Sequence, residues 1–189
     1  MEGLSDQDLL RRVWDLDTDA LSEAYDRYST GIYRYAMRLL GDNSLAEDCV
    51  SESFSRLLEA LRLGRGPHSH LKAYLYRIAH NWITDHYRAS SAREFPLDES
   101  LPDADGKHVE WETERELEKE EVRRALWALS SEQRLVIVLR YVEGWETEQV
   151  AAAVNKSPGA IRGLQHRALR TLRKHLSDEE EEDTHETAR

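Results

Sequence analysis

The sequence predicts an all-α protein made of two small helical domains, the second a helix-turn-helix. Apolar residues recur at intervals of three to four through most of the chain, which is the spacing of one helix face. The nine glycines and four prolines fall mostly where a helix would begin or end. No segment shows a convincing strand pattern. A length of 189 residues suits one domain or two small ones.

Two helices are expected at the start of the chain. Ser5 can cap a short helix that runs to about Leu16, because its hydroxyl can accept from a free backbone N–H group. Asp17 or Thr18 can cap the next helix in the same way. Gly41 is expected to end this second helix, which carries tyrosines and leucines at helical spacing.

A third and a fourth helix follow. The segment Ser44-Leu45-Ala46-Glu47 has the S-x-x-E pattern of a capping box, and Gly64 would end the helix that it opens. Ser69 can open the fourth helix, LKAYLYRIAHNWITDHYRA. We therefore expect a first domain over residues 1–91.

The pattern then breaks in a stretch that is rich in carboxylates and contains Pro96, Pro102 and Gly106. Such a composition buries too little apolar area to offset the entropy of ordering, so we expect an acidic flexible linker over 92–117. Ser130-Ser131-Glu132-Gln133 offers a capping box inside a second domain at 118–176. The acidic residues 177–189 are expected to form a disordered tail.

The sequence at the end of the second domain predicts a helix-turn-helix. Thr147 can cap the short helix ETEQVAAAV, and Asn155 suits a turn because it tolerates left-handed backbone angles. Ser157 can then cap a longer helix in which Pro158 takes the first position. A short helix, a tight turn and a longer basic helix present the second helix to the major groove of DNA.

Charge supports this interpretation. The chain has a formal net charge of -11, yet residues 155–176 contain no Asp or Glu. Arg162 and Gln165 lie in the first two turns, where they could reach base edges, while Arg170 and Arg173 lie further along and should contact phosphates. The alternative is a surface helix that is basic without binding anything.

A second cationic segment runs from Arg62 to Arg93, with Asp85 as its only carboxylate. Aromatic residues are interleaved with its cations, a combination that suits single-stranded nucleic acid. Arg77 and Tyr87 are candidates for this contact. The alternative is that half of these aromatics belong to the core.

These stretches together resemble an extracytoplasmic-function (group IV) sigma factor of bacterial RNA polymerase. AEDCVSESFSRLLEAL resembles the segment that docks on the clamp helices of the polymerase, and AYLYRIAHNWITDHYR resembles the segment that opens and reads the promoter −10 element. LSSEQRLVIVLRYVEGWETEQVAAAVNKSPGAIRGLQHRALRTLR resembles the −35-binding domain. The resemblance implies three partners: core RNA polymerase, through its clamp helices and flap, promoter DNA, and an anti-sigma factor.

The resemblance also implies which residues contact the polymerase and the two promoter elements. It places the core-polymerase contact at Glu47, Asp48 and Glu52. It places the −10 contact around Asn81, with Asp85 and Arg88 on the same helix. It places the −35 contact at Lys156, Ser157, Ala160, Arg162 and Arg167.

Four positions depart from the family pattern. Ser51 stands where a Gln is usual, and Tyr74 stands where a Trp is usual before the −10 segment. In the recognition helix, Leu164 and Gln165 replace the usual Arg and Leu, so the −35 sequence cannot be transferred from relatives.

Other classes fit less well. His68, His70, His80, Asp85 and His86 could suggest a metal-dependent hydrolase, but their spacing matches no recognised ligand motif. A helix-turn-helix repressor would need no clamp-docking segment and would normally dimerise, whereas we expect a monomer when free. Cys49 is alone, and no run of about 18 apolar residues exists. We expect a cytoplasmic, non-enzymatic protein with neither a metal nor a cofactor and no membrane span.

Overall fold

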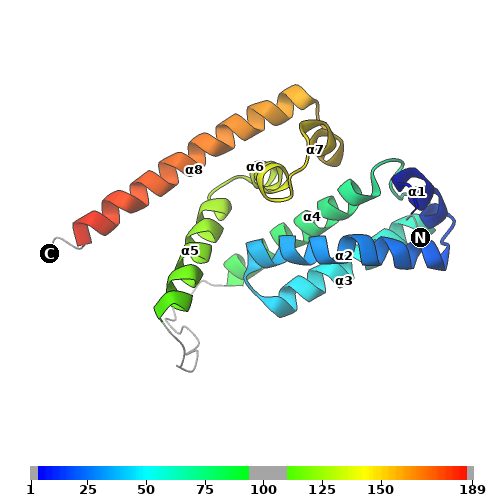
Figure 1. The fold of residues 1–189 in the computed structure, drawn as a ribbon, viewed down its shortest axis with the longest axis horizontal. Coiled ribbons are helices and arrows are strands. Elements are labelled where there is room, and N and C mark those ends of the chain that lie inside the picture. Colours follow the sequence, from blue (N-terminus) through cyan, green and yellow to red (C-terminus); the bar gives the residue numbers. More distant parts are fainter. Residues whose placement is uncertain (1–3, 94–109, 187–189) are drawn as a thin grey trace.

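The computed structural model describes residues 4–93 and 110–186, and within these ranges every element is helical. The all-α class is therefore confirmed. Figure 1 shows the arrangement of the elements along the chain. They are α1 (Asp6–Trp14), α2 (Thr18–Leu40), α3 (Asn43–Arg62), α4 (Leu71–Arg93), α5 (Glu110–Trp127), α6 (Ser131–Ile137), the π-helical turn η1 (Val138–Val142), α7 (Thr147–Val154) and α8 (Pro158–Glu186).

Several helix ends lie where side-chain chemistry predicts them. Ser5 Oγ accepts from the Asp8 N–H, and the Asp17 carboxylate accepts from two backbone N–H groups at the start of α2. Gly41 ends α2 in the left-handed region, with φ of 71°. The capping box of Ser130 and Gln133 opens α6 as expected.

Two predicted caps are wrong by one or two residues. Helix α3 begins at Asn43, because the Asp42 carboxylate accepts from the Leu45 N–H at 2.8 Å and leaves Ser44 inside the helix. Helix α7 is capped by Glu146, which forms a capping box with Gln149, so Thr147 is its first helical residue. In both cases a neighbouring acidic side chain takes the role that the sequence analysis gives to a hydroxyl.

The helices extend further than the sequence analysis expects. Helix α5 begins at Glu110, inside the predicted linker, and α8 continues to Glu186, inside the predicted tail. Both extensions contain neither Gly nor Pro and are rich in Glu, which is a good helix former. Pro96, Pro102 and Gly106 of the predicted linker lie outside the described residues.

The first domain is built around α2, α3 and α4, which pack on one another. Gly31 of α2 permits a close crossing, since a Cβ there would lie 2.6 Å from Tyr76 Oη of α4. Cys49 is fully buried between α3 and α4, and its thiol faces the Ala79 carbonyl at 3.8 Å. Burial raises the pKa of this thiol to about 12.

The second domain packs α6 and α7 beneath α8. Between α6 and α7, η1 is a turn of π-helix in which the Glu143 N–H donates to the Val138 carbonyl at 3.0 Å. The apolar run LVIVLRYV does not predict this π-helical turn. Such insertions occur mostly as single turns and often at functional sites.

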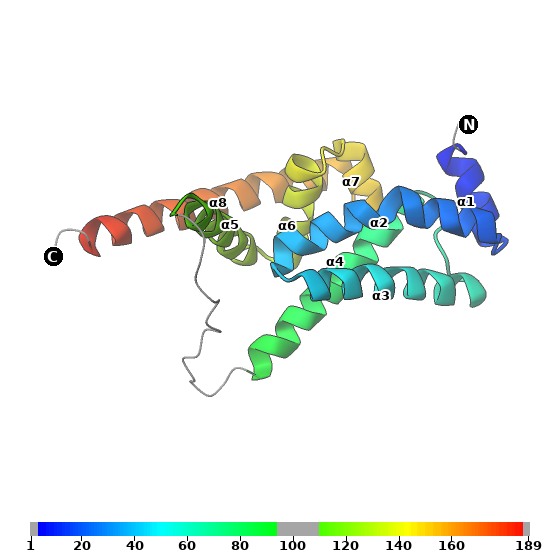
Figure 2. The same cartoon turned by 60° about the horizontal axis from the view of Figure 1, so that its bottom comes forward.

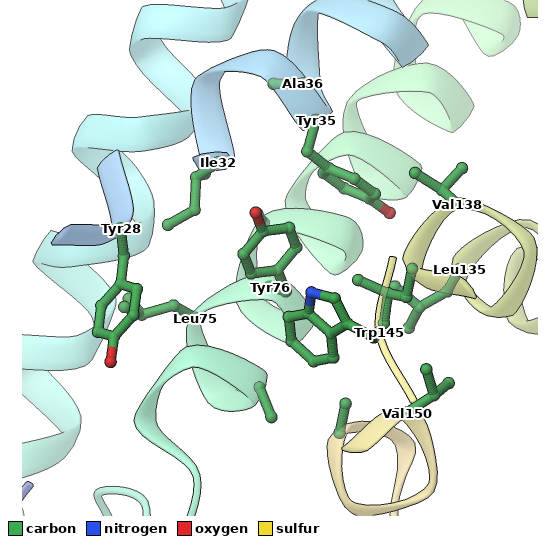
Figure 3. Packing of buried hydrophobic residues seen from close by; sticks show 14 of the residues in the cluster. Tyr28, Ile32, Tyr35, Ala36, Leu75, Tyr76, Leu135, Val138, Trp145 and Val150 are labelled. Atoms are coloured by element: carbon green, nitrogen blue, oxygen red, sulfur yellow. The ribbon is translucent and has the colours of Figure 1, made fainter. Parts of the chain in front are cut away.

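The two domains touch. Helix α7 packs against α4 and α5 packs against α2, and the views in Figures 1 and 2 both place α6 and α7 beside the first domain. Figure 3 shows Tyr76 of α4 and Trp145 at the centre of this contact, with ring centroids 5.1 Å apart. Their buried side chains belong to one continuous cluster that crosses the domain boundary.

Candidate nucleic-acid interface

The helix-turn-helix expected at the end of the second domain is present. Asn155 lies in the left-handed region with φ of 53° and ends α7. Ser157 Oγ accepts from the Ala160 N–H at 3.2 Å, and Pro158 begins α8. Ile161, Leu164 and Ala168 are buried. The opposite side of α8 is therefore available to a partner.

Most of the predicted −35 residues lie on that available side. Arg162, Arg167, Arg170 and Arg173 are exposed, as is Ala160. Lys156 is half-buried, and its ammonium pairs with the Glu132 carboxylate at 3.0 Å. The exposed cations form an electropositive surface on α8, which is what phosphate binding requires.

His166 and Tyr141 were not singled out by the sequence analysis. His166 is exposed and lies one turn after Arg162 and one turn before Arg170, a spacing that could have identified it. Tyr141 of η1 is 55% exposed, and its hydroxyl accepts from Gln165 Nε2 at 2.6 Å. The π-helical turn thus holds the side chain of a predicted base-reading residue.

Helix α4 presents a separate stripe to solvent. Arg77, Asn81, Asp85 and Arg88 are all exposed, and their spacing of three and four residues places them on one face. Tyr74 borders this stripe, with the Arg77 guanidinium 5.2 Å from its ring centroid. Cations beside an accessible aromatic ring suit an unpaired strand.

The other aromatics of α4 face elsewhere. Tyr87, predicted at the −10 contact, stacks on Trp127 of α5 with ring centroids 3.5 Å apart and an angle of 13° between the rings. Tyr76 is buried, and Trp82 is half-buried with its ring stacked on His86. The structure therefore brings together four of the five predicted −10 residues and turns the fifth toward the second domain.

An acidic surface lies on α3, whereas the two cationic surfaces lie on α4 and α8. Glu47 and Asp48 are exposed, while Glu52 is half-buried and pairs with Arg56 at 2.7 Å. A shallow cavity of about 440 Å³ borders it, and Tyr25 and Val50 are among its lining residues. Carboxylates next to a hollow lined by both polar and apolar side chains suit a protein surface that combines basic and apolar side chains.

The histidines do not converge on a metal site. His68 stacks on Trp14, His86 stacks on Trp82, and His80 is buried between two hydroxyl groups. Within residues 4–93 and 110–186, no group of three or more His, Cys, Asp or Glu residues could hold a metal ion. In the same part of the chain, no helix has the length and apolar character to cross a membrane.

Two family models match the segments of the chain that contain these surfaces. The model of Sigma-70 region 2 matches residues 24–93, which include α4, and the model of Sigma-70 region 4 matches residues 125–174, which include the first half of α8. The chain is 32% identical over 177 residues to the ECF RNA polymerase sigma factor BldN of Streptomyces coelicolor and covers 66% of that protein. It is 30% identical to the ECF RNA polymerase sigma factor SigL of Mycobacterium tuberculosis and covers 87% of it.

Solved structures share the fold. CnrH in complex with the cytosolic domain of CnrY matches 92% of this chain with a TM-score of 0.67 at 23% identity. The sigma factor RpoE in complex with the anti-sigma factor NepR, from Bartonella quintana, matches 82% of the chain with a TM-score of 0.54 at 22% identity. The chain therefore belongs to the ECF family of RNA polymerase sigma factors, whose members direct promoter-specific initiation of transcription.

Proposed function

We propose that each domain of this sigma factor reads one promoter element, the second domain (118–176) through α8 and the first (1–91) through α4. The observation that carries this proposal is the pair of exposed stripes, Arg162 to Arg173 and Arg77 to Arg88, on the two matched family segments. The whole chain has a formal net charge of -11, so the residues outside these stripes are strongly acidic, repel DNA and confine binding to the stripes.

At the −35 element, α8 enters the major groove by its N-terminal half. Arg162 can bind guanine through two hydrogen bonds, and Gln165 can bind adenine in the same manner. Gln165 gives one N–H to Tyr141, which leaves its second N–H and its carbonyl for a base. Arg170 and Arg173 lie further along the helix and neutralise phosphates.

At the −10 element, the stripe on α4 holds a base that has left the duplex. Flipping a base costs a few kcal/mol, which stacking and hydrogen bonds to the base edge must return. Asn81 offers a donor and an acceptor at the middle of the stripe, and Tyr74 offers a ring beside it. Arg77 and Arg88 flank Asn81 and can follow the phosphate backbone.

The acidic surface of α3 then binds the clamp helices of the core polymerase, while the second domain meets the flap. Glu47 and Asp48 are exposed for this contact. An anti-sigma factor is a further proposed partner, since the similar sigma factor RpoE of Bartonella quintana is bound to the anti-sigma factor NepR in its solved structure. In this function the chain is a non-catalytic cytoplasmic protein, monomeric when free, that needs neither metal nor cofactor.

Run-off transcription with purified core polymerase on a genomic fragment library tests the proposal. The expected result is a set of transcripts whose start sites share a −35 and a −10 element. Transcripts that start at the same sites with and without the chain would contradict it. Size-exclusion chromatography adds a second test, because a helix-turn-helix repressor would elute as a dimer and ignore the polymerase.

A further inference from the structure

Few carboxylates surround the helix-turn-helix of α7 and α8. Residues 130–176 contain four, which are Glu132, Glu143, Glu146 and Glu148. Glu143 is engaged elsewhere, since its carboxylate accepts from the Tyr76 hydroxyl of α4 at 2.9 Å. Helices α6 and α7 both pack against α8, and Glu132 and Glu146 lie at the starts of these two helices (Figure 1). Both therefore lie beside the part of the second domain that meets DNA.

Glu132 pairs with the lysine of the turn between α7 and α8. Its Oε1 lies 3.0 Å from Lys156 Nζ, with 59% of the Glu132 side chain and 33% of the Lys156 side chain exposed. An ion pair this open to solvent adds little to folding stability. Its main effect is on charge, because Lys156 directly precedes Ser157, the cap of α8, and would otherwise neutralise a phosphate.

Glu146 occupies the start of α7. Its side chain forms a capping box with Gln149, and its N–H donates to Gln149 Oε1 at 2.9 Å. The first helix of a helix-turn-helix crosses the DNA backbone, and free N–H groups at helix N-termini are common phosphate ligands. In α7 a carboxylate holds this position, and 78% of the Glu146 side chain is exposed. A phosphate therefore meets repulsion where it would otherwise find hydrogen-bond donors.

Local stability does not require the charge of Glu146. Ser, Thr, Asp and Asn cap helices best, and Glu is not among them. The neighbouring helix α8 is capped by the uncharged hydroxyl of Ser157. Arg140 Nη1 lies 3.8 Å from the Glu146 carboxylate and also donates to the Trp145 carbonyl, so it offsets only part of the charge. The remaining negative charge acts outward, toward solvent and DNA.

We propose that Glu132 and Glu146 are negative determinants of DNA binding, which weaken the sequence-independent contacts between the second domain and phosphates. This role rests on the proposed reading of the −35 element by α8, and it is opposite to that of Arg170 and Arg173. Phosphate contacts bind every DNA sequence alike, so they draw a free protein onto bulk DNA. With two such contacts weakened, the free chain stays available to core polymerase, and base contacts supply a larger share of the binding free energy.

Binding of the full chain to two duplexes tests this role. One duplex carries a −35 element found by run-off transcription, and the other carries the same bases in scrambled order. Fluorescence anisotropy at several salt concentrations gives the affinity for each. Glu132→Gln and Glu146→Ser should each tighten binding roughly threefold on both duplexes, because each removes a repulsive charge near a phosphate. Glu132→Gln should also steepen the slope of log affinity against log salt by about one, since Lys156 is freed for a phosphate.

Controls separate this effect from net charge and from folding. Glu121→Gln makes the same charge change at an exposed residue of α5, outside the helix-turn-helix, and should leave both affinities unchanged. In a Lys156→Gln background, Glu132→Gln should give no gain, because the carboxylate acts through that ammonium. Glu146→Ser retains an acceptor for the N-terminus of α7, so the melting temperature should stay within a few degrees.

Unchanged affinity of both variants on both duplexes would overturn the inference. An effect confined to the −35 duplex would overturn it as well, because a carboxylate that accepts from the N4 amine of a cytosine reads a base. A wild-type chain that binds both duplexes equally would contradict the proposed function instead. Tighter binding of the variants to the scrambled duplex would in that case still support the role of the two carboxylates.

Discussion

The imidazole of His80 is held between the Tyr35 hydroxyl on one side and the Ser131 hydroxyl on the other, at 2.6 and 2.8 Å. A neutral imidazole has one donor and one acceptor nitrogen, and a hydroxyl can serve either, so both bonds form without a charge. Burial and the nearby Arg134 guanidinium lower the pKa of His80 to about 4. The junction between the domains is therefore built for an uncharged histidine.

Mild acid should weaken the folded state through this residue. In the unfolded chain His80 binds a proton below a pH of about 6.5, whereas in the folded chain it does so only near 4. The free energy of unfolding should therefore fall as the pH drops through this window, by about 3 kcal/mol in total. Urea unfolding of the wild type and of His80→Gln at several pH values measures the effect, and identical pH dependence of the two would contradict it.

Reversal of one carboxylate on α3 should weaken binding to the polymerase. Asp48 is exposed on the acidic surface, so Asp48→Lys replaces attraction to a basic partner by repulsion. We expect about a tenfold loss of affinity for core polymerase, with binding to −35 DNA unchanged. Asp15→Lys makes the same charge change at the end of α1 and serves as the control. Equal pull-down of polymerase by the wild type and Asp48→Lys would refute the assignment of this surface.

Loss of the Asn81 amide should impair promoter opening. Asn81→Ala removes the donor and acceptor at the middle of the α4 stripe, so a flipped base gains less on binding. We expect slower open-complex formation on duplex promoter, and a much smaller effect on a template whose −10 region is already mismatched. If the mismatched template does not rescue the variant, Asn81 supports the helix and does not read a base.

The arginines of α8 should divide into two functional groups. Arg170→Ala should weaken binding about equally on all sequences and lower the slope of log affinity against log salt by about one, because one phosphate contact is lost. Arg162→Ala should relax the preference at particular −35 positions with little change in that slope. A promoter library selected at two salt concentrations gives both quantities, and the same profile for both variants would be inconsistent with this division.

Gln165 and Tyr141 should act on the same base. Gln165→Ala should remove about 1–3 kcal/mol of discrimination at one −35 position. Tyr141→Phe lacks the hydroxyl that restrains the amide and should lose part of the same preference, with no further loss in the double variant. Should both variants keep every −35 preference, the bond between Gln165 and Tyr141 only attaches α8 to η1.

Local chemistry explains which parts of this structure were predictable from sequence. Apolar periodicity and capping residues such as Ser5, Asp17 and Ser130 specify helices within a few residues, and the exposed stripes follow from the same period. The positions of Tyr87 and Gln165 were not predictable, because each is set by a partner distant in sequence, Trp127 and Tyr141. Periodicity along one helix cannot show which other helix will cover it.

The single thiol of the chain has an experimental use. Thiol reagents attack the thiolate, yet Cys49 is fully buried and its pKa is raised to about 12. Modification therefore has to wait until α3 and α4 separate. The rate at which Cys49 is labelled in the natural chain therefore measures local opening of the first domain, without any added tag or substitution. Comparing that rate with and without core polymerase would show whether binding of the polymerase stabilises the packing of α3 on α4 or loosens it.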